Sequence, residues 1–258
     1  QQIDEFGIDK FNEACRSQVQ TNTENWEKIT RKIGRWVDFE NDYKTMDIDF
    51  MESVWWVFKE LWSKGLIYQD YKVLPYSWAA STPLSNFEAN MDYRDVEDPS
   101  IFFTVVARDD FHNVKKGDQF LVWTTTPWCI PGNLAIAVGE SIEYTRVKIE
   151  KNFYWIARER LIELDKHDYE IIDSCVGKDL IGSTYFPAYS EYEHFYKDGA
   201  FRIIHSNDTN TESGSGLVSQ APAYGESDFY TLKNSNIDVI ADPVTLSGRF
   251  DSTFEESL

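Results

Sequence analysis

The sequence predicts an α+β fold: a mainly β, barrel-like domain with peripheral helices, preceded by an N-terminal helical segment. Apolar residues recur at helical spacing over residues 7–64, whereas short strand-like runs separated by turn residues follow from residue 66 onward. Many short strands with few helices between them are typical of a barrel or a folded sheet. An aromatic share of 16% can fill the core of such a domain and argues against a disordered chain.

We expect three parts along the chain: a helical segment over residues 1–65, an irregular connector over 66–100 and the β-rich domain over 101–258. The clearest helix is predicted to begin after Asp49, with Glu52 as its capping-box partner and Gly65 as its stop signal. One face of this helix is apolar and is predicted to dock into a core. The residues of this apolar stripe are Met51, Val54, Trp55, Phe58, Leu61 and Trp62.

Turn residues separate the strand-like runs. Strands are expected at residues 66–68, 71–74, 102–106, 120–123, 134–138, 144–149, 153–156, 169–172, 201–204 and 216–218. A short helix is expected over residues 157–164, and a later one is expected to begin near Gly225 or Ser227.

Composition excludes several classes of function. A net charge of −19 argues against a surface that binds nucleic acid by neutralising phosphates. The three cysteines have no paired spacing and the four histidines no metal-ligand spacing, so we expect a reducing compartment and no metal site. No run is apolar and long enough to span a membrane and no secretory signal opens the chain, so no membrane partner is predicted.

One stretch combines three adjacent hydroxyls with two tryptophans: Trp123-Thr124-Thr125-Thr126-Pro127-Trp128, continuing through Cys129 to Asn133. It follows a strand-like run, and the ends of strands are where a rigid scaffold commonly presents its chemistry. An ordinary structural interpretation is also open, because threonine favours strands and Thr-Pro is common where a strand enters a turn.

A second stretch begins with Gly214-Ser215-Gly216 and runs through Ser219, Gln220 and a Pro/Gly turn to Asp228. We expect a strand, the turn, and then the first turn of a helix that contains Asp228. A carboxylate there can complement the helix dipole, worth a few tenths to about 1 kcal/mol. It can equally hold the ammonium group of a ligand.

Together, the two stretches resemble signatures of the editing domain, or connective insertion, of isoleucyl-tRNA synthetase. The first is similar to WTTTPWTLPxN and the second to GTGxVHxAPxxGxxDY. Upstream runs at residues 34–45, 50–58 and 82–88 resemble the same enzyme, closest to its eukaryotic cytosolic type. No HIGH-type or KMSKS-type signature occurs, so we expect the chain to be a piece of a longer synthetase that does not contain the aminoacylation site.

This resemblance implies a post-transfer editing hydrolase that cleaves the aminoacyl ester of mischarged Val-tRNA(Ile) and excludes isoleucine. It implies that Asp228 holds the α-ammonium group, while Thr124, Thr125 and Thr126 supply hydroxyls to the ester, the ribose or the attacking water. The remaining residues that it implies for substrate binding are Trp123, Trp128, Cys129, Asn133, Ser219 and Gln220.

The resemblance also implies the partners. We expect the aminoacylated 3′ end of tRNA(Ile) and the remainder of the synthetase as partners of a cytoplasmic monomer that needs no cofactor. ATP binding would belong to the full-length enzyme.

Two departures from the family pattern leave an alternative open. Ser219 stands where the family usually has histidine, and Cys129 stands where it usually has threonine. Serine cannot act as a base near neutral pH as imidazole can. The alternative is therefore a catalytically weakened module that binds aminoacyl-adenosine, or one with a purely structural role.

Overall fold

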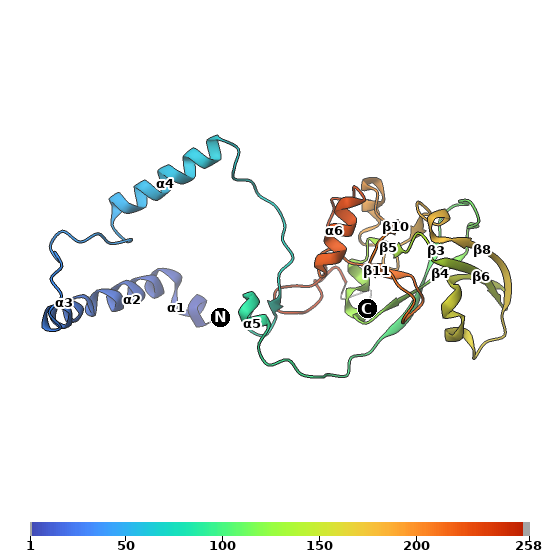
Figure 1. The fold of residues 1–258 in the computed structure, drawn as a ribbon, viewed down its shortest axis with the longest axis horizontal. Helices are drawn as coiled ribbons and strands as arrows, with labels where there is room; N and C mark the ends of the chain where they lie inside the picture. The colour runs from blue at the N-terminus through green and yellow to red at the C-terminus, as the bar shows by residue number, and fades with distance from the viewer. Residues whose placement is uncertain (1, 255–258) are drawn as a thin grey trace. The chain divides into compact units, whose positions relative to one another are not determined.

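The computed structural model describes residues 2–254, and the chain divides into two compact units, residues 1–70 and 71–258 (Figure 1). Residue 1 and residues 255–258, at the outer ends of the first and third predicted parts, lie outside the described residues. Within residues 2–254, none of the helices combines the length and the apolarity that a membrane span requires.

The first unit is helical, as predicted. Its helices are α1 (Gln2–Phe6), α2 (Ile8–Thr21), α3 (Thr23–Lys32) and α4 (Ile48–Ser63). The predicted capping box of α4 is wrong. The helix starts directly after Asp47, and the side chain of Asp47 accepts a hydrogen bond from the backbone N–H of Lys44 (3.2 Å) instead of capping the helix.

The C-terminal stop of α4 is confirmed. Gly65 has a φ of +66°, and the N–H of Leu66 donates to the carbonyl of Leu61 (3.1 Å). This positive φ is the conformation that glycine adopts without strain at the end of a helix.

The apolar stripe of α4 does not pack into a core in this structure. Its side chains are exposed, Trp55 to 67% and Trp62 to 60%, and α4 contains no buried residue. The physical reason lies within the first unit, because its described residues form no second layer that could cover this face.

The chain around the boundary of the two units also differs from the sequence prediction. Residues 66–68 and 71–74 form no strand and belong to neither of the sheets that the described residues form. The regular elements that follow are the short antiparallel pair β1 (Tyr76–Ser77) and β2 (Thr82–Pro83), and the single turn α5 (Asn86–Ala89). A capping box between Ser85 and Glu88 starts α5.

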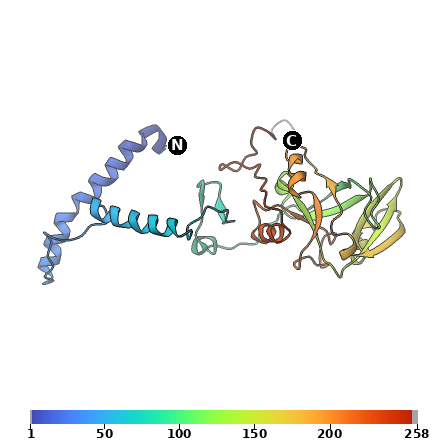
Figure 2. The same ribbon diagram turned by 90° about the horizontal axis from the view of Figure 1, so that it is seen from above.

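Nine strands of the described residues form one curved, half-barrel-like sheet, which makes the fold α+β as predicted (Figures 1 and 2). These strands are β3 (Ile101–Ala107), β4 (Gln119–Thr124), β5 (Ala135–Val138), β6 (Glu143–Ile149), β7 (Asn152–Ala157), β8 (Glu170–Val176), β9 (Tyr185–Phe186), β10 (Arg202–His205) and β11 (Val218–Gln220). The helical elements between and after them are the 3₁₀ helices η1 (Pro127–Gly132), η2 (Arg158–Leu164), η3 (Gly177–Asp179) and η4 (Glu193–Asp198), and the α-helix α6 (Glu226–Asn234).

The central strand of this sheet is β4. It pairs antiparallel with β3 and parallel with both β7 and β11, and β11 pairs antiparallel with β5 on its other edge. The four residues of β5 are all fully buried, which explains their uninterrupted apolar sequence. The strands expected from residue 102 onward are confirmed within a few residues, and the helix expected over 157–164 is the 3₁₀ helix η2.

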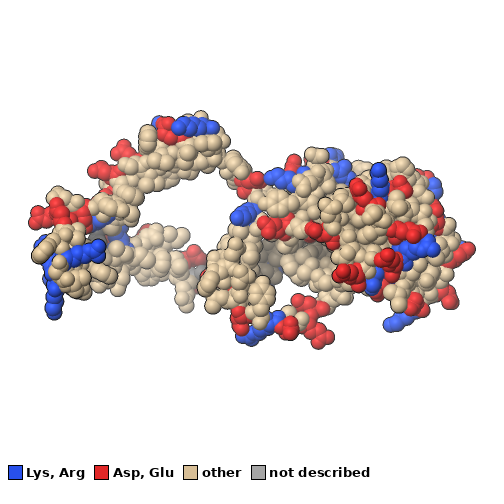
Figure 3. All heavy atoms as spheres, in the orientation of Figure 1, with Lys and Arg blue, Asp and Glu red and all other residues tan. Residues whose placement is uncertain are grey.

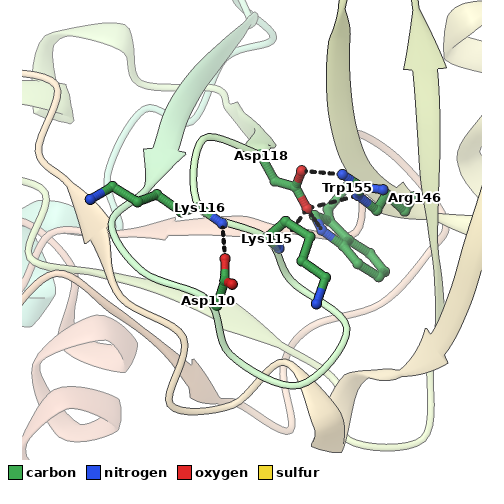
Figure 4. Close-up of polar contacts among 6 residues, drawn as sticks. All are labelled: Asp110, Lys115, Lys116, Asp118, Arg146 and Trp155. Carbon is green, nitrogen blue, oxygen red and sulfur yellow. Dashed lines mark hydrogen bonds and ion pairs between the residues drawn. The ribbon is translucent and has the colours of Figure 1, made fainter.

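A buried ion pair holds the loop between β3 and β4 against strand β6 (Figure 4). Asp118, 2% exposed, receives two hydrogen bonds from the guanidinium of Arg146 (2.7 and 2.8 Å) and one from the indole N–H of Trp155 (3.0 Å). The backbone N–H of Lys115 donates a fourth, at 2.9 Å. These four donors compensate the buried charge of the carboxylate.

We expect Asp118→Ala to lower the free energy of unfolding by about 3–5 kcal/mol, because it leaves the Arg146 guanidinium buried without its partner. Urea denaturation of both proteins measures the loss. The matched control is Asp110→Ala in the same loop, where an exposed carboxylate accepts one hydrogen bond from the backbone N–H of Lys116 (2.7 Å). That change is expected to cost about 1 kcal/mol or less, and equal losses for the two variants would contradict this account.

Candidate functional site

The pairing of β11 with β4 brings the two sequence stretches together. The strands run parallel with Val218 opposite Trp123, and the N–H of Trp123 donates to the carbonyl of Leu217 (3.2 Å). The next residue on each strand is Thr124 and Ser219. Two segments more than ninety residues apart therefore end side by side, where the C-terminal ends of β4 and β11 meet one edge of the sheet.

A cavity of about 130 Å³ opens at this edge. The residues that line it come from the end of β4 with η1, from β11 with its turn, and from the start of α6. They are Thr124, Thr126, Trp128, Cys129, Ser219, Ala221, Tyr224, Gly225 and Asp228. Pockets for drug-sized ligands measure about 300–1,000 Å³, so this one suits only a small chemical group.

The threonine wall is held by local hydrogen bonds. The backbone N–H of Thr126 donates to Oγ1 of Thr124 (3.1 Å), and the two hydroxyl oxygens lie 3.3 Å apart. Thr124 is 8% exposed, whereas Thr126 faces the solvent side. Pro127 starts η1 directly afterwards, so the chain leaves the strand at the second hydroxyl.

The opposite wall carries Asp228, in the first turn of α6. Its carboxylate accepts a hydrogen bond from the backbone N–H of Ala221 (2.8 Å). A Cβ on Gly225, the N-cap residue, would lie 2.9–3.2 Å from the carboxyl atoms, so the glycine makes room for the carboxylate. Burial raises the pKa of Asp228, with a smaller contribution from the charge of Asp208, while the Ala221 hydrogen bond lowers it.

Two aromatic rings form a third side of the cavity. Trp128 and Tyr224 meet edge to face, with ring centroids 4.9 Å apart. The Tyr224 hydroxyl donates to a carboxylate oxygen of Asp242 (3.0 Å) and accepts from the backbone N–H of Val244 (3.2 Å). Tyr224 was not among the residues predicted from the sequence. Its only sequence signal is its position inside the second stretch, four residues before Asp228.

Of the ten residues predicted for the site, six line the cavity. They are Thr124, Thr126, Trp128, Cys129, Ser219 and Asp228. Strand alternation accounts for two of the others, because neighbours on a strand point to opposite faces. These two are Trp123, which lies against Gly214, and Gln220, which is 4% exposed. Thr125 lies in the bend directly after β4 and is exposed.

The tenth residue, Asn133, lies directly behind the cavity. Its side-chain amide donates to the hydroxyl oxygen of Ser219 (2.9 Å) and to the carbonyl of Ala135 (2.8 Å). Its carbonyl oxygen accepts from the hydroxyl of Tyr185 (2.7 Å). Tyr185 lies in β9, and nothing in the sequence connects it with either stretch.

Only one acidic group of the cavity can carry charge at neutral pH. Burial raises the pKa of the Cys129 thiol to about 11, partly offset by a hydrogen bond with Thr126, and burial likewise raises the pKa of Tyr224. The thiol therefore stays protonated and serves as a small apolar wall. The lining combines one carboxylate with several hydroxyls, which suits a small ligand bearing an ammonium group and polar oxygens.

Comparisons with known proteins agree on a family. Residues 1–231 match the family of class I tRNA synthetases (I, L, M and V). The chain is 44% identical to an isoleucine–tRNA ligase of Protochlamydia amoebophila over 258 residues, covering 98% of this chain and 24% of that protein. It is 45% identical to that of Bdellovibrio bacteriovorus over 251 residues, covering 95% and 23%. The chain thus spans about a quarter of the length of these curated relatives.

Two solved structures show a partial similarity to this chain. A structure described as the CP1 of GlLeuRS has a TM-score of 0.46 at 16% identity, covering 53% of this chain and 58% of that one. The editing domain of the cytosolic leucyl-tRNA synthetase of P. knowlesi has a TM-score of 0.42 at 14% identity, covering 52% and 62%.

The raised pKa of Asp228 predicts a pH signature. Between the ordinary Asp pKa of about 3.9 and the raised value, the folded chain binds more protons than the unfolded chain. The free energy of unfolding of the wild type should therefore fall, relative to Asp228→Asn, as pH rises through this window, and the difference should then level off. Asparagine retains the acceptor for the Ala221 N–H, so the comparison isolates the charge.

Urea denaturation at a series of pH values measures this difference. Asp238→Asn, at an exposed aspartate in the loop after α6, controls for the loss of one negative charge. If the free energies of unfolding of wild type and Asp228→Asn differ by the same amount at every pH, the folded environment does not disfavour the charge of the Asp228 carboxylate.

Proposed function

Because the chain belongs to the class I tRNA synthetases (I, L, M and V), we propose that its β-rich unit is a hydrolytic editing module that deacylates mischarged Val-tRNA(Ile). One observation carries the proposal: a cavity of about 130 Å³ has a half-buried carboxylate on one wall and two threonine hydroxyls on the other. A small aminoacyl ester carries the groups that these two walls can bind, an ammonium and ester oxygens.

Asp228 would bind the α-ammonium group of the aminoacyl ester. The carboxylate is partly desolvated and receives only one hydrogen bond, from Ala221, among the described residues. An arriving ammonium compensates this charge with a charge-assisted hydrogen bond, which a neutral group does not do. The pocket therefore selects for a free amino group.

The hydroxyls of Thr124 and Thr126 would face the ester. Threonine is stiff about its first side-chain torsion, so these hydroxyls are held at low entropic cost. No histidine lines the cavity, and Cys129 stays a thiol, so no lining group other than Asp228 is suited to act as a base. Positioning of the ester and its water, with electrostatic stabilisation of the developing charge, would then carry catalysis. Roles for Trp123, Thr125 and Gln220 stay predictions.

Size selection explains why such a site is needed. A pocket that must distinguish two substrates by one methylene gains only about 1–3 kcal/mol, and isoleucine against valine in isoleucyl-tRNA synthetase is the known example. A second, smaller cavity can exclude isoleucine by overlap and hydrolyse the valyl ester. The ring pair of Trp128 and Tyr224 is the bulky wall that would set this limit.

The wider setting of the module belongs to the same proposal. We propose the aminoacylated 3′ end of tRNA(Ile) and the remainder of a synthetase as partners, in a cytoplasmic monomer built as residues 1–65, 66–100 and 101–258. On the face drawn in Figure 3, acidic and basic side chains are interspersed over the β-rich unit, so most of the grip on tRNA would come from other domains. The relatives described above are bacterial, and the eukaryotic cytosolic type stays a prediction.

The serine at position 219 favours one alternative, a pocket that binds the aminoacyl-adenosine end but turns it over weakly. Titration with a non-hydrolysable valyl-adenosine analogue separates the two functions. Binding together with hydrolysis of Val-tRNA(Ile) supports editing, whereas binding without hydrolysis supports the alternative. Absence of binding would leave a structural role.

Asp228→Ala is expected to lower kcat/KM for deacylation of Val-tRNA(Ile) by about 10- to 100-fold, the equivalent of a lost hydrogen bond to a charged group. A single-turnover assay with purified mischarged tRNA measures this change. Ile-tRNA(Ile) is assayed in parallel, since loss of the anchor can also relax discrimination.

The control is Asp238→Ala, which removes an exposed carboxylate outside the cavity and should leave the rate unchanged. Equal rates for wild type and Asp228→Ala would remove Asp228 from the mechanism.

Gly225→Ala should affect the site more than the fold. The new Cβ would come within 2.9–3.2 Å of the Asp228 carboxyl atoms, which can move aside because they end a short side chain. We expect deacylation to fall by about tenfold or more, because small displacements of a positioning group are costly. Circular dichroism should report an unchanged fold. A variant with full activity would mean that the carboxylate position is not critical.

A further inference from the structure

Two hydrogen bonds connect a buried tyrosine with the candidate site. We call the three residues that they join, Tyr185, Asn133 and Ser219, the relay. Tyr185 is fully buried, and its hydroxyl lies 2.7 Å from Oδ1 of Asn133, itself 6% exposed. Nδ2 of Asn133 lies 2.9 Å from Oγ of Ser219, which lines the cavity. The three side chains come from β9, from the end of η1 and from β11.

Proton positions in this relay follow from hydrogen-bond chemistry. The atom of Asn133 that faces the carbonyl of Ala135 at 2.8 Å must be the nitrogen, because a carbonyl oxygen only accepts. The oxygen of the amide therefore faces Tyr185, and the phenol donates its single proton to it. The second N–H of Asn133 then donates to Ser219.

This arrangement limits what the Ser219 hydroxyl can do. Its oxygen accepts from Asn133, and its proton makes no hydrogen bond to another of the described residues. We propose that Tyr185 and Asn133 are positioning residues that preset Ser219 as a hydrogen-bond donor into the cavity, toward an oxygen of the bound aminoacyl ester. This inference rests on the proposed editing function. It adds that the Ser219 hydroxyl acts in the cavity as a hydrogen-bond donor.

The physical benefit is preorganisation. A free hydroxyl can turn in all directions, whereas a hydroxyl that accepts from Asn133 keeps its proton turned away from that donor. Fewer orientations then have to be lost when the proton meets an oxygen of the ligand. A donor aimed at an oxygen where negative charge develops stabilises the transition state more than the ground state. Loss of the Tyr185 hydroxyl would leave Oδ1 of Asn133 as a buried acceptor without a donor. The carbonyl of Ala135 would still hold the nitrogen of the amide, but the side chain would be less firmly fixed and its contact with Ser219 would loosen.

A double-mutant cycle tests the relay. Tyr185→Phe and Ser219→Ala are each expected to lower kcat for deacylation of Val-tRNA(Ile) by about tenfold with little change in KM, because the contact is made mainly in the transition state. The double variant should be no slower than Ser219→Ala alone, because Tyr185 acts only through Ser219. Losses that multiply would overturn the proposal, as would an unchanged rate for Tyr185→Phe.

The matched control is Tyr144→Phe. Tyr144 is equally buried, and its hydroxyl donates to the carbonyl of Gly216 (2.7 Å) outside the cavity. This variant loses the same atom and should lower the melting temperature without changing kcat. If Tyr185→Phe does not fold, Asn133→Asp takes its place in the cycle, because a carboxylate can only accept and would draw the proton of Ser219 out of the cavity.

A readout without turnover separates this proposal from the editing function. The side-chain amide protons of Asn133 should exchange slowly with solvent in the wild type and faster in Tyr185→Phe, as measured by NMR. Slow exchange in a chain that does not hydrolyse Val-tRNA(Ile) would refute the editing function and leave the relay standing. Fast exchange in an active wild type would refute the relay alone.

Discussion

Strand β11 is three residues long, and the hydrogen bonds along its two edges hold both halves of the cavity. On one edge it runs parallel to β4, so that Ser219 follows Val218 just as Thr124 follows Trp123. On the other edge it pairs antiparallel with the fully buried β5, where the N–H of Leu134 donates to the carbonyl of Gln220 (3.0 Å). Because α6 starts a few residues later, the same pairing also determines where Asp228 lies. A change of one residue in this register would turn Ser219 away from the cavity.

Two carboxylates of the second unit, the buried Asp118 and the half-buried Asp228, differ in how their charges are compensated. Asp118 has four donors from the protein, including both arms of the Arg146 guanidinium, so its charge contributes to the fold. Asp228 has one backbone donor, and burial disfavours its charge. An under-compensated carboxylate in a small cavity is typical of binding sites rather than of structural ion pairs. Asp118 thus stabilises the fold, whereas the surroundings of Asp228 agree with the ammonium-binding role that we propose for it.

Local sequence was most informative where structure depends on near neighbours. The strands after residue 102, the end of α4 at Gly65 and the start of α6 could all be predicted from periodicity and from turn or cap residues. Predictions that required knowledge of a partner were wrong. The runs at 66–74 have strand-like composition but join no sheet of residues 2–254, and the stripe of α4 is apolar but uncovered by the described residues of its own unit. Pairing and burial are properties of two segments, and one segment does not specify the other.

The sequence by itself determined which functional groups the site contains, because each wall is built from residues close together in the chain. One wall comes from the threonines around Thr124, and the other from the turn that leads to Asp228. Tertiary structure decided which of those side chains face the cavity. Trp123 points to the opposite face of β4, and Thr125 lies exposed in the bend that follows the strand. It also recruited Tyr185, far from both walls in sequence, to orient the amide behind Ser219. Hydrogen bonds between distant segments depend on how the sheet curls and on its register, and these are set by the packing of the whole unit.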